Sequence, residues 1–132
     1  MPGVVGAYTG YAEETPVSSA ARTTSSNSGA ITSYSGAATL RAQLEVTAAS
    51  GTTPTLDVVI EDTLDGTNWN VVGTFVQKVT TGREVINVHP AKAESATFQP
   101  VFADRLRVRW TVGGTTPSFT FSVVWAAATP GN

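Results

Sequence analysis

Hydrophobic and polar residues alternate along several segments of this chain, and this alternation constrains the fold more than any other feature. It runs through residues 40–47 and 56–61, and again through residues 105–112 and 118–125. Side chains on a β-strand point alternately to opposite faces, so each segment is predicted to be a strand with one buried face. A single helical turn is expected at residues 91–95, and an all-β fold elsewhere.

A four-residue sequence recurs between these segments. Gly51-Thr52-Thr53-Pro54 separates the first two, and Gly114-Thr115-Thr116-Pro117 separates the last two. Each unit is predicted to be a hairpin whose apolar face cannot be buried alone. Two hairpins packed face to face would form an antiparallel β-sandwich of about eight strands, with jelly-roll and immunoglobulin-like topologies both open. The predicted core consists of the apolar residues in register: Leu40, Leu44, Val46, Leu56, Val58, Ile60, Leu106, Val108, Trp110, Phe119, Phe121, Val123 and Trp125.

The chain is expected to divide into three regions. Residues 1–36 are rich in Gly, Ala, Ser and Thr and lack a sustained period, which predicts an extended N-terminal arm with short strands near 17–24 and 30–34. Residues 37–126 would form the sandwich domain, and residues 127–132 a loose tail. Aromatic residues are scarce in disordered tails, so an arm that orders on a neighbouring subunit is favoured over a disordered one. The aromatic residues of the arm are Tyr8, Tyr11 and Tyr34.

Composition narrows the classes of function. The 132 residues suit one domain, and the absence of cysteine excludes disulfides and thiolate metal sites. A net charge of −2 argues against nucleic acid as a partner. The chain has no apolar run that could cross a membrane and no secretory signal, so a soluble protein made in the cytoplasm is expected. Its 21 threonines and 11 serines predict a surface that loses little desolvation energy when a partner covers it.

No group of residues points to catalysis, a cofactor or a metal. His89 is the only histidine and precedes Pro90, which favours a surface loop. Asp62, Asp65 and Asn68 faintly resemble a calcium loop, but the distal Glu of such loops is missing, and a turn capped by Asp and Asn is favoured. Two carboxylates for glycoside hydrolysis would have to face each other across a cleft, whereas Glu61 and Asp65 flank a turn. We therefore expect a protein that is not an enzyme.

Three arginines form a stripe on the polar face of one predicted strand. They are Arg105, Arg107 and Arg109, and Arg41 is expected to extend the stripe. Ion pairs between subunits remain open as an alternative to pairing within the chain. The partners expected within the chain lie on neighbouring strands: Glu45, Asp57 and Glu61.

The three tryptophans have different expected roles. Trp110 and Trp125 lie in the apolar register of their strands and are predicted to be core residues. Trp69 follows the turn at residues 65–68 and is less determined, so it is the one candidate for stacking on a sugar ring.

Two stretches resemble a motif of small structural proteins of tailed-bacteriophage virions. The first, residues 50–69, is SGTTPTLDVVIEDTLDGTNW, and the second, residues 106–123, is LRVRWTVGGTTPSFTFSV. The similarity covers residues 40–76 and 104–125, about half of the chain. It implies a β-sandwich used as a head-decoration protein or as a head or tail accessory protein, and it carries no catalytic residues.

These observations favour a capsid-decoration (cement) protein on the virion head surface. It would bind the outer face of the major capsid protein lattice and form a homo-oligomer, with a trimer as a plausible form. A tail-tube or head–tail connector component is one alternative. A host-surface or carbohydrate-binding module, using Trp69 and the loops at residues 63–68 and 90–100, is another. The candidate interface residues are Tyr8, Tyr11, Tyr34, Arg41, Arg105, Arg107 and Arg109.

Overall fold

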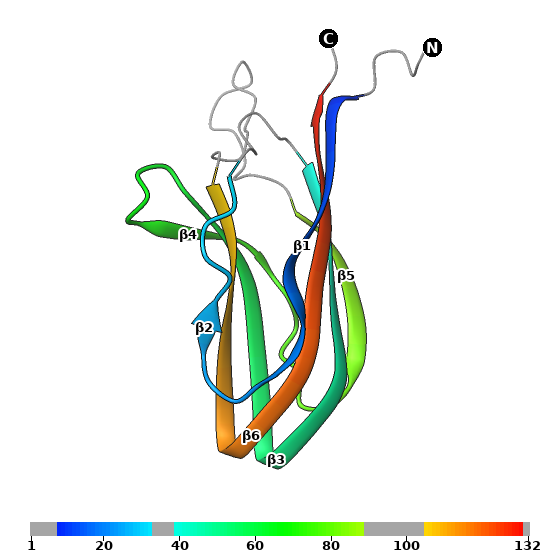
Figure 1. Cartoon of the computed structure of the whole chain (residues 1–132), viewed down its shortest axis with the longest axis vertical. Coiled ribbons are helices and arrows are strands. Elements are labelled where there is room, and N and C mark those ends of the chain that lie inside the picture. The colour runs from blue at the N-terminus through cyan, green and yellow to red at the C-terminus, as the bar shows by residue number, and fades with distance from the viewer. Residues whose placement is uncertain (1–7, 33–38, 89–104, 131–132) are drawn as a thin grey trace.

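The protein is an antiparallel all-β molecule, as the alternation predicts. A computed structural model describes residues 8–32, 39–88 and 105–130. None of these residues lies in a helix that could span a membrane. The helical turn expected at residues 91–95 lies outside the described residues. The described residues form six strands (Figure 1): β1 (Tyr8–Arg22), β2 (Ser26–Asn27), β3 (Thr39–Thr63), β4 (Trp69–Thr74), β5 (Gly82–Val88) and β6 (Arg105–Pro130).

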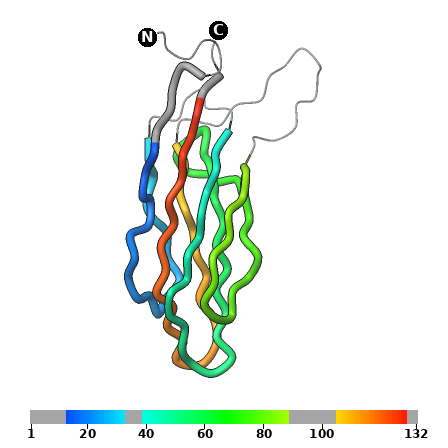
Figure 2. Tube along the Cα trace, turned by 90° about the vertical axis from the view of Figure 1, so that its right-hand side faces the viewer, coloured from blue at the N-terminus to red at the C-terminus, as the bar shows by residue number. Residues whose placement is uncertain are grey.

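Two long strands, β3 and β6, organise the fold. They pair with each other along almost their whole length, and each bends where Gly-Thr-Thr-Pro occurs, at the bottom of Figure 1. The bend divides the ladder into two layers. The first layer has the order β1, second half of β6, first half of β3, β5, and these strands stand side by side in Figure 2. The second layer has the order β2, first half of β6, second half of β3, β4.

This arrangement confirms the sandwich but corrects two details of the prediction. The strands number six instead of about eight, because each predicted pair of strands is one continuous bent strand. The two predicted hairpins do not exist, since the halves of β3 pair with β6 and not with each other. A Gly-Thr-Thr-Pro sequence can reverse a chain or turn it through a corner, and here the neighbouring strand determines which occurs.

The two corners lie against each other and have nearly the same geometry. Gly51 and Gly114 have φ angles of 112° and 109°. A Cβ added to Gly51 would lie 2.7 Å from the carbonyl oxygen of Thr116, and one added to Gly114 would lie 2.7 Å from that of Thr53. Thr53 and Thr116 themselves have φ angles of 45° and 46°, which is costly for β-branched residues. The repeated sequence thus builds one close-packed, strained tip.

The core lies between the two layers. Every residue predicted for it is buried, including Trp110 and Trp125. Trp110 from the second layer meets Phe121 from the first edge to face, with ring centroids 5.6 Å apart. Sequence periodicity missed further core residues, among them Val17 of β1, Phe75 after β4, Val88 of β5 and Ala127 near the end of β6.

Residues 8–31, which fall within the predicted arm, lie on the sandwich. β1 pairs with β6, Val17 is buried, and the segment around β2 lines the first half of β6. β6 likewise continues through Ala127 and Ala128, where a loose tail was expected. The division of the chain into an arm, a domain and a tail at residues 36 and 126 therefore stays a prediction. In the described residues, β1 and the end of β6 are part of the sheet.

Arg22 fixes the crossing from β1 to β2. Its guanidinium carbon lies 5.1 Å from the ring centre of Trp110 and 4.7 Å from that of Phe121. Burial lowers the pKa of this guanidinium. The indole N–H of Trp110 donates to the carbonyl of Thr24 at 3.1 Å. Arg22 also donates to the carbonyl oxygens of Ser18, Ala20 and Phe121. These contacts hold the segment between β1 and β2 against the core.

Candidate functional site

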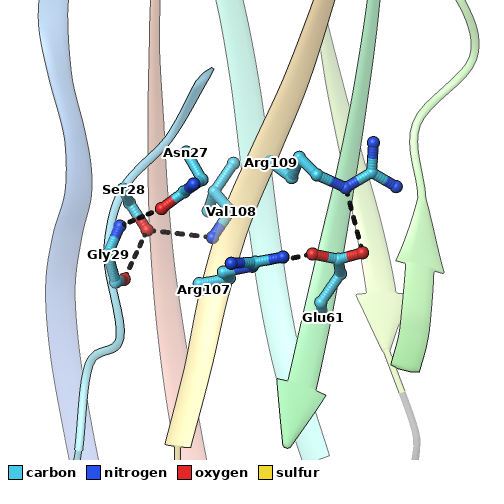
Figure 3. A network of polar contacts seen from close by, with 7 residues as sticks. All are labelled: Asn27, Ser28, Gly29, Glu61, Arg107, Val108 and Arg109. Carbon is cyan, nitrogen blue, oxygen red and sulfur yellow. Dashed lines mark hydrogen bonds and ion pairs between the residues drawn. The ribbon is translucent and has the colours of Figure 1, made fainter. Parts of the chain in front are cut away.

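A charged cluster occupies the outer face of the second layer. Glu61 on β3 accepts a hydrogen bond at 2.8 Å from Nε of Arg107 and one at 3.0 Å from Nε of Arg109, both on β6 (Figure 3). The register explains this, since Glu61 stands opposite Arg107 and Val59 stands opposite Arg109. The arginines therefore flank the carboxylate, and each of its oxygens has one charged donor. We call Glu61, Arg107, Arg109 and Trp69 the arginine cluster.

Trp69 on β4 completes the cluster. The guanidinium carbon of Arg107 lies 4.1 Å from the centre of the Trp69 ring. This cation–π contact covers one face of the ring. Glu61 is only 4% exposed although it lies in the outward register of its strand. Arg107 and Arg109 each donate to one of its oxygens, and these two charged hydrogen bonds offset its desolvation.

Arg109 is the part of the cluster that remains available to a partner. Its side chain is 41% exposed, compared with 20% for Arg107. Figure 3 shows its two other guanidinium nitrogens directed away from Glu61. With two arginines and one glutamate the three charged groups have a surplus positive charge, so this face can receive a carboxylate from another molecule.

The predicted arginine stripe is thereby partly explained. Pairing within the chain is confirmed for Arg107 and Arg109, with Glu61 as the partner. Arg105 donates to the carbonyl oxygen of Leu64 at 3.4 Å. Arg41 does not extend the stripe, because the bend in β3 places it in the first layer, where it donates to Asn87 at 3.0 Å.

The other predicted partners of the stripe have different contacts. Asp57 accepts hydrogen bonds at 3.1 Å from the side-chain amide of Gln77. Glu45 belongs to the first layer, opposite Arg83 and Ser122. Of the three carboxylates predicted to pair with the stripe, Glu61 is therefore the one that forms these arginine ion pairs.

The loop between β3 and β4 is a turn capped by Asp65. The Asp65 carboxylate accepts hydrogen bonds from the backbone N–H groups of Asn68 and Thr67, at 2.7 and 2.8 Å, and from the Asn68 side chain at 2.7 Å. These bonds, those of Asn68 foremost, hold the pKa of Asp65 well below its usual range. Gly66 donates to the Thr63 hydroxyl at 2.9 Å. The capped-turn interpretation is therefore confirmed, and within the described ranges no three potential metal ligands gather.

A second surface feature is an open groove on the outer face of the first layer. It crosses all four strands of that layer and places acidic side chains of β1 on one side and Arg41 on the other. Its lining includes Glu13, Glu14, Arg41, Gln43, Val85 and Val124.

The remaining candidate residues are placed as follows. Tyr8 and Tyr11 lie in β1, opposite Pro130 and Ala128 of β6. Tyr34 and His89 lie outside the described residues. The proposed interface role of the tyrosines stays a prediction.

Sequence reasoning missed two parts of the cluster. It did not anticipate that Trp69 stacks on Arg107, since the register of β4 depends on the geometry of the preceding turn. It also did not anticipate that Glu61 is buried on an outward face. The alternation did place Arg107, Arg109 and Glu61 on polar faces, and this was the signal that identified them.

Comparisons with known proteins show the fold. No family model matches the chain, and no curated protein matches it. VP2 in a subviral particle of infectious bursal disease virus superposes with a TM-score of 0.58 at 15% identity, over 92% of this chain and 32% of VP2. Particles with T=1 symmetry derived from the same virus give a TM-score of 0.58 at 12% identity, over 92% and 32% of the chains.

A further match comes from a protein described as exported. The PBSX exported protein XepA gives a TM-score of 0.53 at 14% identity, over 92% of this chain and 38% of that chain. The chain thus spans about a third of the length of the proteins that it resembles. At these identities the likeness establishes a shared β-sandwich fold.

Proposed function

We propose that this chain is a non-enzymatic structural protein of a virion, and specifically a capsid-decoration protein that binds the outer surface of a major capsid protein lattice. The observation that carries the proposal is the fold, which is shared with VP2 of a subviral particle and with the T=1 particles derived from the same virus. The resemblance of residues 50–69 and 106–123 to tailed-phage structural proteins supports the same class independently of the fold.

The arginine cluster is the proposed contact with the capsid. Arg109 is held by Glu61 at one nitrogen and directs the others outward, so its orientation is set before binding. A preoriented guanidinium loses less conformational entropy when it pairs with a carboxylate of a partner.

The structure gives less support to a carbohydrate-binding module. That role would require Trp69 to offer a ring face to a sugar, and Arg107 already covers one face. Tail components remain an alternative position within the same class of protein, and the experiment below separates them from decoration.

The test is a binding titration of the purified protein against empty tailed-phage heads that carry the major capsid protein encoded in the same genome. A decoration protein saturates at a copy number proportional to the number of capsid subunits. We expect Arg109→Ser to weaken head binding on the order of tenfold. Arg41→Ser, which removes an exposed arginine from the opposite face, should leave binding unchanged.

Circular dichroism of each variant checks that it remains folded. Absence of binding to heads together with recovery on purified tails would replace decoration with a tail role. Equal loss in both variants would remove the arginine cluster as the contact.

A further inference from the structure

The edge strands of the sandwich differ in how they are protected from pairing with other chains. β1 contains Pro16 and the charged pair Glu13 and Glu14, and its register with β6 shifts at three places. β2 has only two residues, and the β4 ladder shifts between Ile60 and Glu61. Prolines, bulges, charges and short length are the usual ways to block an exposed edge.

β5 lacks the prolines and register shifts of the other edges, and its two charged residues, Arg83 and Glu84, are of opposite sign. Its seven residues pair with β3 without a register shift and include no proline. Among the described residues its strand pairing is with β3 alone, so the alternate backbone N–H and C=O groups along its other edge face outward from the ladder. Such an edge can add another strand through backbone hydrogen bonds.

Exposed apolar side chains lie in β5 and in the segment that precedes it. Val76, Val79 and Val85 are 69%, 56% and 43% exposed, and they are three of the five large hydrophobic residues that the described surface exposes. Val85 lies within β5, and Val79 precedes it by a short turn. The backbone N–H of Val76 donates to the Glu84 side chain at 3.0 Å, which places Val76 next to the strand. A partner on this edge would therefore also cover apolar surface.

The charge pattern of β5 fits a second copy of the same strand. In an antiparallel pair centred on Val85, that residue faces its own counterpart, Arg83 faces Asn87, and Glu84 faces Ile86. All seven residues are then paired and no like charges meet. Centring the pair on Glu84 or Arg83 would place two identical charges opposite each other, which is destabilising. Centring it on Ile86 would shorten the pairing.

We propose that two copies of this chain associate through β5 in this Val85-centred register. The first layers of both copies then form one continuous sheet. A two-fold axis perpendicular to that sheet keeps equivalent faces on the same side. Both arginine clusters consequently face one direction, and the dimer presents two equal contacts to whatever surface it binds. This pairing yields an even number of copies, unlike the trimer that the sequence suggested.

The experiment is sedimentation velocity on the full chain over a dilution series. The wild type should dimerise. Val85→Lys places two like charges across the axis and should raise the dimer dissociation constant at least on the order of tenfold. Val71→Lys is the matched control, since Val71 is 51% exposed on β4 in the other layer, and it should dimerise like the wild type.

A mixture tests the register itself. Val85→Lys and Val85→Glu should each dimerise more weakly than the wild type when measured alone. An equimolar mixture of the two should recover the dimer, because the introduced lysine faces the introduced glutamate. Thermal unfolding of each variant checks the fold. A monomeric wild type, an unaffected Val85→Lys dimer, or a mixture that fails to recover would each overturn the proposal. These measurements use no particles, so their outcome is independent of the proposed capsid role.

Discussion

The two layers of the sandwich carry their charges in opposite ways. On the second layer, Glu61 is almost fully buried and pairs with both Arg107 and Arg109. On the first layer, Arg41 and Arg83 are exposed, and the partner of Arg41 is the neutral Asn87. Both sets lie in the outward register of their strands. The outward register therefore does not by itself mean that a charge is solvated.

This difference determines what each charge contributes. A buried ion network is costly to form and more costly to break, because removal of one member leaves the others desolvated without compensation. Exposed charges on a strand contribute a fraction of a kcal/mol and are screened by salt. Matched substitutions on the two faces should therefore have unequal effects.

The largest effect is expected when the shared carboxylate is neutralised. Glu61→Gln keeps the shape of the side chain but leaves Arg107 and Arg109 adjacent without a counter-charge. The free energy of unfolding should fall by about 2–4 kcal/mol. Urea denaturation followed by tryptophan fluorescence measures it.

The control is Glu45→Gln, which makes the same chemical change on the first layer. It should alter the free energy of unfolding by no more than about 0.5 kcal/mol. Similar losses in the two variants would show that the cluster is solvated and that the two faces do not differ.

A smaller effect is expected from Arg107→Lys. A lysine keeps the charge but loses both the guanidinium contact over the Trp69 ring and the directed Nε–H bond to Glu61. We expect a loss of about 1–2 kcal/mol in the same assay. Arg41→Lys, on the first layer, should cost no more than about 0.5 kcal/mol. An unchanged free energy of unfolding in Arg107→Lys would mean that charge alone holds the cluster together.

The contrast between the layers also shows what a sequence can predict. Alternation identified the strand segments, the core residues and the outward faces, because the period of two follows directly from strand geometry. It did not reveal that β3 and β6 bend instead of reversing. Arg41 was therefore assigned to the stripe. It would extend the stripe only if both halves of β3 lay in the same layer, whereas the bend places Arg41 in the first layer.

β1 was predicted only in part, as a short strand near residues 17–24, for a different reason. The register of β1 against β6 shifts between Glu14 and Val17 and again between Val17 and Ala20. Each shift moves later side chains to the other face, so the alternation is interrupted, and among residues 13–22 of β1 Val17 alone joins the core cluster. A bulged edge strand therefore leaves little periodic signal, and the same bulges protect it from pairing.

The smallest expected effect concerns an exposed carboxylate of the second layer, Asp65. Its folded pKa is depressed by the N–H donors of Asn68 and Thr67, so its contribution to stability is complete above the unfolded pKa of about 3.9 and is lost as the pH falls from there through the folded value. Urea denaturation between about pH 5 and about pH 2 should show a shallower acid decline for Asp65→Asn than for the wild type. Thr67→Ala keeps the backbone donor and the carboxylate, and should keep the wild-type decline. Equal slopes in all three proteins would mean that the turn forms its hydrogen bonds in the unfolded chain as well, so that the ionisation of Asp65 is not coupled to folding.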